Sequence, residues 1–190
     1  MYKVIALIGK AGAGKDTILK YIKDNVASKY INIIVSCTTR PKRDYEVDGK
    51  DYYFLTHEEF SKKLIEDEIL EAAFFNEWCY GTPIEALRED KVNIGVFNPA
   101  GIEALKTHKN IIDLEVFYID AIDKVRLIRQ LEREQKPNIE EIYRRYKADF
   151  EDFYDLDFDY TLLINNKEED IMGCAHTIFT TIYSMYKEIS

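Results

Sequence analysis

The sequence has few of the features that mark secreted, zinc-binding or membrane proteins. Its 190 residues include only three cysteines, Cys37, Cys79 and Cys174, and no two of them form a C-x-x-C pair. This pattern argues against a zinc site and against a disulfide framework. No apolar run approaches the roughly 20 residues of a membrane helix, and the opening residues MYKVIALIG do not resemble a signal peptide. We therefore expect a cytoplasmic protein that does not bind a membrane.

Positive charge is also scarce. The chain has 35 Asp and Glu residues against 26 Lys and Arg residues, which gives a formal net charge of -9. A broad nucleic-acid-binding surface normally needs excess positive charge, so we do not expect nucleic acid as a partner. Hydrophobic residues make up 46% of the chain, which is enough for the packed core of one domain.

Short apolar runs alternate with helical patterns along much of the chain. This alternation predicts an α/β fold in which helices sandwich a parallel sheet. The expected strands cover residues 3–8, 31–36, 92–97, 114–119 and 160–165. The expected helices cover residues 15–29, 99–108 and 168–187, with a charged helical region from about 122 to 153 that is interrupted at QKPN.

Two segments interrupt the alternation. Residues 36–82 are rich in tyrosine, and Thr56 and Glu59 within them have the spacing of a capping box at the start of a helix. Residues 126–153 are rich in arginine and lysine. We expect a ligand-binding insertion and a helical lid, because α/β enzymes place their chemistry in such excursions. The remaining core would consist of residues 1–35, 83–125 and 154–190.

A glycine-rich loop follows the first predicted strand. Gly9, Gly14 and Lys15 satisfy G-x-x-x-x-G-K between a strand and a helix, which is the context of a P-loop. Its backbone N–H groups and the helix dipole favour an anion, and Lys15 would stabilise charge on a moving phosphoryl group. The pattern predicts the P-loop NTPase class of α/β fold. The residues expected to bind ATP here are Gly9, Ala11, Gly12, Ala13, Gly14, Lys15, Asp16 and Thr17.

Asp16 departs from the P-loop pattern. A serine or threonine hydroxyl normally binds magnesium at this position, and a carboxylate can bind it too but adds a full negative charge. One interpretation is that Asp16 is a metal ligand. The alternative is that it only charges the first turn of the helix, where aspartate is favoured.

The run SCTTRPKRDYEVDGKDYYF supplies groups suited to a phosphate monoester. Arg40 and Arg43 are two rigid guanidinium groups near tyrosines, and the hydroxyl of Tyr52 could reach the same phosphate. Further along, the carboxylate of Glu71 could accept hydrogen bonds from the N–H groups of a guanine edge.

Taken together, these motifs resemble the guanylate kinase family. The family has a phosphate loop, then S-x-T-T-R, an arginine three residues later, E-V-x-G-x-D-Y-x-F, a glutamate after an apolar pair, and Y-G-[ST]. This chain has the same motifs in the same order between residues 9 and 82, where the resemblance is strongest, and the resemblance covers essentially its whole length. The resemblance implies a kinase that uses ATP and magnesium to phosphorylate GMP or dGMP.

The resemblance also implies roles for individual residues. The expected contacts of the GMP phosphate are Arg40, Arg43, Tyr52 and Tyr80. The expected contacts of the guanine base are Ser36, Glu71, Thr82 and Asn98. The expected arginines of the lid, which would neutralise the transferring phosphoryl group with Lys15 and Arg40, are Arg129, Arg133 and Arg145, or Arg144 in place of the last. Asn165 resembles the position that borders the adenine of ATP. The alternative for the lid arginines is a solvated helix face with i,i+4 charge pairs.

The main departure from the family lies in VNIGVFNPAG. The family has an acidic D-x-D pair where this chain has Val96 and Asn98. One acid would support magnesium, and we hypothesise that Asp16 compensates for its loss. Asn98 permits guanine without enforcing it. Two alternatives therefore stay open, namely a kinase for another nucleoside monophosphate and a non-catalytic binding module. A monomer and a homodimer are equally compatible with the sequence.

Overall fold

The computed structural model describes residues 1–75, 77–133 and 136–189 and contains two β-sheets. The central sheet has the strand order β2-β7-β1-β8-β9, and all its pairs are parallel. Its strands are β1 (Tyr2–Ile8), β2 (Ile31–Ile33), β7 (Val92–Val96), β8 (Ile112–Asp120) and β9 (Thr161–Ile164). The predicted α/β class with a parallel sheet between helices is confirmed.

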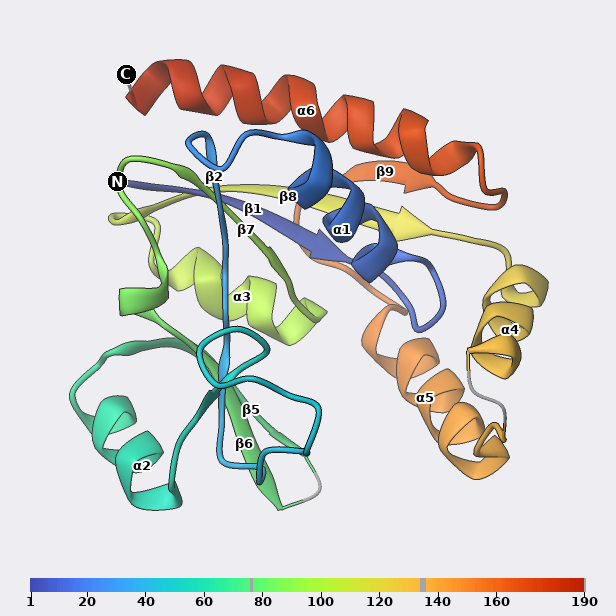
Figure 1. Cartoon of the computed structure of the whole chain (residues 1–190), viewed down its shortest axis with the longest axis horizontal. Coiled ribbons are helices and arrows are strands. Elements are labelled where there is room, and N and C mark those ends of the chain that lie inside the picture. The colour runs from blue at the N-terminus through green and yellow to red at the C-terminus, as the bar shows by residue number, and fades with distance from the viewer. Residues whose placement is uncertain (76, 134–135, 190) are drawn as a thin grey trace.

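Helices cover both faces of the central sheet (Figure 1). Helices α1 (Lys15–Asn25) and α6 (Asp170–Ile189) pack on one face, and α3 (Pro99–Thr107) packs on the other. The side chains of β1 alternate between the two faces, with Ile5 and Leu7 toward α1 and Val4 toward α3. Burial on both faces explains why this strand is continuously apolar.

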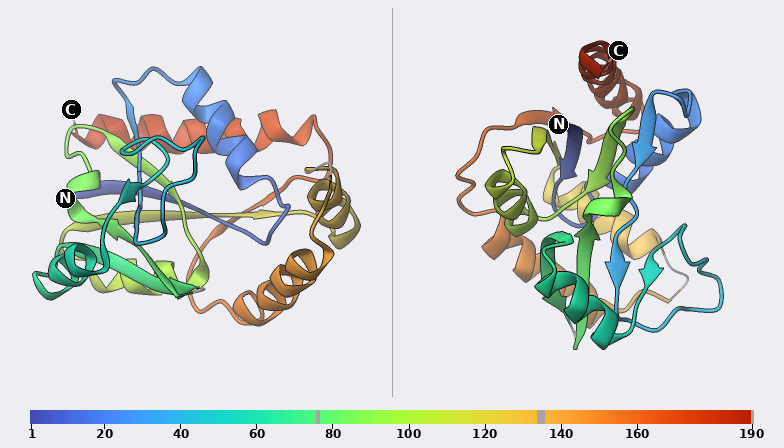
Figure 2. Two further views of the ribbon diagram at one scale, coloured as in Figure 1. Left: turned by 60° about the horizontal axis from the view of Figure 1, so that its bottom comes forward. Right: turned by 90° about the vertical axis from the view of Figure 1, so that its left-hand side faces the viewer.

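The second sheet has the order β4-β3-β6-β5 and lies to one side of the central sheet (Figure 2). Its strands are β3 (Cys37–Thr38), β4 (Tyr53–Phe54), β5 (Ile69–Phe75) and β6 (Trp78–Pro83). Helix α2 (His57–Ile65) covers it, and Phe60 fills a small core against Cys37 and Ile69. The capping box predicted for Thr56 and Glu59 is confirmed at the start of this helix.

Two helices lie beyond the carboxyl ends of the central strands (Figure 1). They are α4 (Asp123–Glu132) and α5 (Ile139–Asp152), and they divide the charged region as the sequence predicts. Two predicted boundaries differ by three residues or more. The first helix ends at Asn25 because Val26 is extended and buried, and β2 ends at Ile33, after which the chain turns toward the second sheet. A short 3-10 helix, η1 (Ile84–Ala86), precedes β7.

No helix in the described parts of the chain is both long and apolar enough to cross a membrane.

A buried asparagine fixes the edge of the central sheet. The Asn93 side chain is fully buried and donates to the carbonyl oxygens of Arg88 (2.9 Å) and Lys3 (3.1 Å). Its own oxygen accepts from the Arg88 N–H at 2.7 Å and from Asn32 at 2.8 Å. One side chain therefore satisfies polar groups of β1, β2 and the loop before β7.

We predict that Asn93→Ala lowers the free energy of unfolding by about 3 kcal/mol, because it leaves several buried polar groups without partners. A urea titration measures this change. Asn110→Ala, at an exposed turn, is the control. A loss below about 1 kcal/mol would contradict the structural role of Asn93.

Candidate active site

The phosphate loop joins β1 to α1 and packs very closely against its neighbours. Gly9, Gly12 and Gly14 all have positive φ, at 152°, 80° and 100°. A Cβ on Gly9 would lie 2.2 Å from the carbonyl oxygen of Ile119, and one on Gly12 would lie 2.5 Å from that of Arg126. Glycine is therefore needed both for the backbone conformation and for the close approach.

Lys15 begins α1, and its side chain folds back over the loop. Its ammonium group donates to the carbonyl oxygens of Gly9 at 2.5 Å and Lys10 at 3.3 Å. Burial lowers the pKa of Lys15 below its ordinary value, since desolvation disfavours the charged form. The geometry places a cation at the mouth of the loop, beside the N-terminus of a helix.

A cavity of about 1220 Å³ opens in front of the loop, and we call it the larger cavity. Its walls come from the loop, from α4 and α5, and from the turn after β9. The candidate residues in its lining are Ala11, Gly12, Gly14, Lys15, Asp16, Thr17, Arg43, Arg129, Arg133, Arg145 and Asn165. Gly9 and Ala13 are buried behind this surface and do not line the cavity.

The three candidate lid arginines differ in their contacts. Arg129 donates to the carbonyl oxygen of Asn165 at 2.9 Å, so it supports the wall of the cavity. Arg145 donates to Glu141 at 2.7 Å, and Arg133 is exposed at the end of α4. Hydrogen bonds from Arg144 and then Arg145 lower the pKa of Glu141 to about 2. Glu141 therefore partly neutralises the arginines of α5.

Asn165 has an unused acceptor at the cavity wall. Its side chain is 1% exposed, and its Nδ2 donates to the carbonyl oxygen of Ala13 at 2.8 Å. Its Oδ1 is buried and has no partner among the described residues. Buried polar atoms in folded proteins are nearly always satisfied, so an N–H donor of a bound ligand would complete this group.

The second sheet brings together a guanidinium group and two phenol rings. The Arg40 guanidinium lies 5.7 Å from the centre of the Tyr52 ring, and the rings of Tyr52 and Tyr80 are 6.0 Å apart. The pKa of Arg40 is raised mainly by hydrogen bonds to Glu46 and also by its interaction with Tyr80. Arg40, Tyr52 and Tyr80 form what we call the phosphate cluster.

Glu46 holds this cluster in place and was missed as a candidate from sequence. Its carboxylate accepts from both terminal nitrogens of Arg40, at 2.6 and 3.0 Å, and from the N–H of Arg43 at 2.8 Å. The residue is 7% exposed. The sequence signal was its place at the start of EVDGKDYYF.

Arg43 does not join the phosphate cluster. Its guanidinium is exposed, donates to the Tyr45 hydroxyl at 2.8 Å and lines the larger cavity.

A carboxylate and a hydroxyl face each other across β5 and β6. Thr82 donates to Glu71 Oε1 at 2.7 Å, and burial raises the pKa of Glu71. Glu71 Oε2 and Asn98 Oδ1 both lie close to Gly101, at the start of α3. Asn98 caps α3 by accepting from the Gly101 N–H at 2.7 Å, so its oxygen is partly used by the helix.

A smaller cavity, of about 350 Å³, lies between the central sheet and the second sheet. Its lining includes Ser36, Tyr52, Asp16 and Val96. Asp16 also lines the larger cavity, so this exposed carboxylate lies where the two cavities meet. The described residues contain no group of three or more His, Cys, Asp or Glu side chains that could hold a metal.

Comparisons with known proteins agree with this geometry. The family model for guanylate kinase matches residues 1–180. The guanylate kinase of Thermotoga maritima is 31% identical over 180 residues, which cover 89% of this chain and 82% of that enzyme. The guanylate kinase of Synechococcus elongatus is 45% identical over 93 residues, about half of each chain (49%).

The fold is likewise similar to a solved structure. The crystal structure of guanylate kinase from Anaplasma phagocytophilum matches with a TM-score of 0.65 and 23% identity, over 97% of this chain and 87% of that one. The chain therefore belongs to the guanylate kinase family and is a nucleoside monophosphate kinase.

Proposed function

We propose that this kinase transfers the γ-phosphoryl group of ATP to GMP or dGMP. In this proposal residues 36–82 bind the acceptor, and residues 126–153 form a lid over the donor. The observation that carries it is the Glu71–Thr82 pair on the same sheet as the phosphate cluster. The sheet thus offers acceptors for a base and cations for a phosphate.

Catalysis would consist mainly of positioning and charge neutralisation. The phosphate loop and Lys15 would hold ATP in the larger cavity, and Arg40 with Tyr52 and Tyr80 would hold the acceptor phosphate. The attacking phosphate oxygen is already ionised, so the reaction needs no general base. Arg129, Arg133 and Arg145 would neutralise the charge that spreads over the transferring group.

Glu71 would select the base. A guanine edge presents two N–H groups to one carboxylate, and Oε2 of Glu71 has no partner among the described side chains. Thr82 orients the carboxylate through Oε1. Asn98 would contact the base through the hydrogen-bonding groups of its side chain that the cap of α3 does not use.

Asp16 fits a magnesium ion bound together with substrate phosphates. Magnesium usually binds one or two carboxylates plus phosphates and keeps several waters. The exposed carboxylate of Asp16, which lines both cavities, meets that need, and Val96 in the lining of the smaller cavity provides no ligand. Bound there, magnesium would neutralise phosphate charge. We propose that Asp16 takes the place of the missing acid at Val96.

We predict turnover with GMP or dGMP and far less with AMP, CMP or dTMP. An ADP-release assay with each acceptor measures it. Glu71→Gln should raise the KM for GMP by at least about tenfold, because a charge-assisted hydrogen bond is lost. Preferred turnover of another acceptor would contradict the guanine assignment, and GMP binding without turnover would indicate a binding module.

We also predict that the KM for GMP depends on pH. The ionised form of Glu71 accepts the base, so the KM for GMP should rise as pH falls through the pKa of Glu71. Because burial raises this pKa, the rise should begin above the pH expected for an exposed glutamate. The phosphate of GMP titrates near pH 6 in every variant. The difference between the profiles of the wild type and Glu71→Gln therefore isolates Glu71, and identical profiles would contradict its role.

Glu46→Gln should raise the KM for GMP by about tenfold and leave the KM for ATP unchanged, because Arg40 loses its bidentate partner. Steady-state kinetics with each substrate varied in turn separate the two constants. Glu58→Gln, at an exposed position of α2, is the matched control. A change in the KM for ATP alone would contradict this assignment.

Asp16→Ser should lower turnover by about tenfold and raise the magnesium concentration needed for half-maximal rate, since it removes a ligand charge. The double variant Asp16→Ser/Val96→Asp should recover much of that loss, because it places a carboxylate at another position in the lining of the smaller cavity. Magnesium titrations of the rate compare the three proteins. Unchanged magnesium dependence in Asp16→Ser would refute the compensation.

A further inference from the structure

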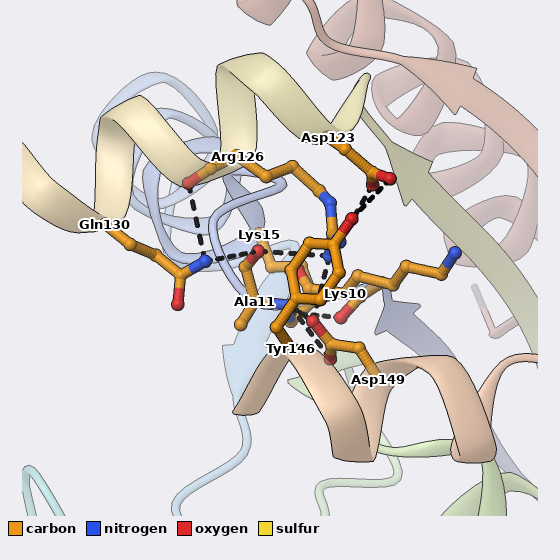
Figure 3. Close-up of polar contacts among 9 residues, drawn as sticks. Lys10, Ala11, Lys15, Asp123, Arg126, Gln130, Tyr146 and Asp149 are labelled. Carbon is orange, nitrogen blue, oxygen red and sulfur yellow. Dashed lines mark hydrogen bonds and ion pairs between the residues drawn. The ribbon is translucent and has the colours of Figure 1, made fainter. Parts of the chain in front are cut away.

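Two charged side chains from outside the phosphate loop hold its backbone at Ala11 (Figure 3). The Ala11 N–H donates to both carboxylate oxygens of Asp149, at 2.8 and 3.1 Å. Arg126 donates to the same carboxylate at 2.9 Å and to the carbonyl oxygen of Ala11 at 3.3 Å. The N–H and the carbonyl oxygen of Ala11 are thus both hydrogen-bonded. Asp149 of α5 binds the N–H, and Arg126 of α4 binds the carbonyl oxygen.

The Arg126 guanidinium is almost fully buried, with its side chain 2% exposed, and Asp149 is 13% exposed. The second terminal nitrogen of Arg126 donates to Asp123 at 3.0 Å, and the Tyr146 hydroxyl donates to the same carboxylate at 2.5 Å. The Tyr146 ring packs 5.2 Å from the guanidinium. A buried charge held by this many contacts has one stable position, and removing its partner would be costly.

The pair contacts the loop outside the lining of the larger cavity. Arg126 and Asp149 do not line the larger cavity, whereas Ala11, Gly12 and Gly14 do. The backbone of α4 also packs directly on the loop, because a Cβ on Gly12 would lie 2.5 Å from the Arg126 carbonyl oxygen. Asp149 therefore binds the backbone of the loop without occupying the surface that faces the larger cavity.

We propose that Arg126 and Asp149 are positioning residues for the kinase reaction. The pair sets the orientation of the Ala11 peptide and ties the phosphate loop to both helices that carry the lid arginines. A P-loop binds phosphate through the directions of its N–H groups, so a rotated peptide would misplace the γ-phosphate. This inference rests on the proposed binding of ATP at the loop and is independent of which acceptor is used.

The test combines ATP binding with steady-state kinetics for Asp149→Asn. Asparagine keeps the shape of the side chain but loses the charge that faces Arg126. We expect the Kd and the KM for ATP to rise about tenfold, while the KM for the acceptor stays within about twofold of wild type. Isothermal titration calorimetry with ATP alone, below the unfolding temperature, gives the Kd without any acceptor.

Two further variants sharpen the result. Arg126→Lys keeps the charge but cannot donate from two separate nitrogens, so it should change the same constants in the same direction. Because the two residues act as a unit, the double variant should be no worse than the more affected single variant. Glu151→Gln removes an exposed ion pair with Lys147 on the same helix and should behave like wild type.

A purely structural pair would lower the unfolding temperature but leave ATP binding unchanged, and this outcome would overturn the proposal. Tighter ATP binding in Asp149→Asn would also overturn it, since Asp149 would then be a competitor of phosphate. Equal changes in the KM for ATP and in the KM for the acceptor would also overturn the proposal. Failure of the proposed function is distinct, because it would show as wild-type protein that does not phosphorylate GMP.

Discussion

The close packing of the phosphate loop is the constraint on which the rest of the site depends. Gly9, Gly12 and Gly14 bring the loop against the end of β8, the backbone of α4 and the side chain of Asn165, at distances that exclude a Cβ. The loop can therefore adopt few conformations without moving these elements. Because α4 packs on the loop and β8 belongs to the central sheet, the loop links α4 to the core.

The second sheet is held by side-chain contacts instead. Short strands of the second sheet place Arg40, Tyr52 and Tyr80 together, and one buried carboxylate, Glu46, fixes the guanidinium. The Glu71–Thr82 pair bridges neighbouring strands of the same sheet. Asp16 lines both cavities, and in the proposed function a metal shared by two polyanions would be needed there.

The sequence was sufficient for the central sheet and for the groups that belong to local motifs. Short sequence patterns identify the loop glycines, Lys15 and the motifs of residues 36–82. The alternation of strands and helices predicted the parallel sheet. Arg126 and Asp149 could not be predicted, because they are 23 residues apart and meet only when α4 and α5 pack on the loop. The exact ends of α1 and β2 also depend on tertiary packing, which local propensity does not contain.

We propose that the two cavities form one site for transfer between ATP and GMP. A compound that joins adenosine to guanosine through five phosphates should occupy both cavities at once. Calorimetry should then show it to bind about 10²-fold more tightly than either ATP or GMP, because the second contact becomes intramolecular. Binding no tighter than that of ATP alone would contradict the account.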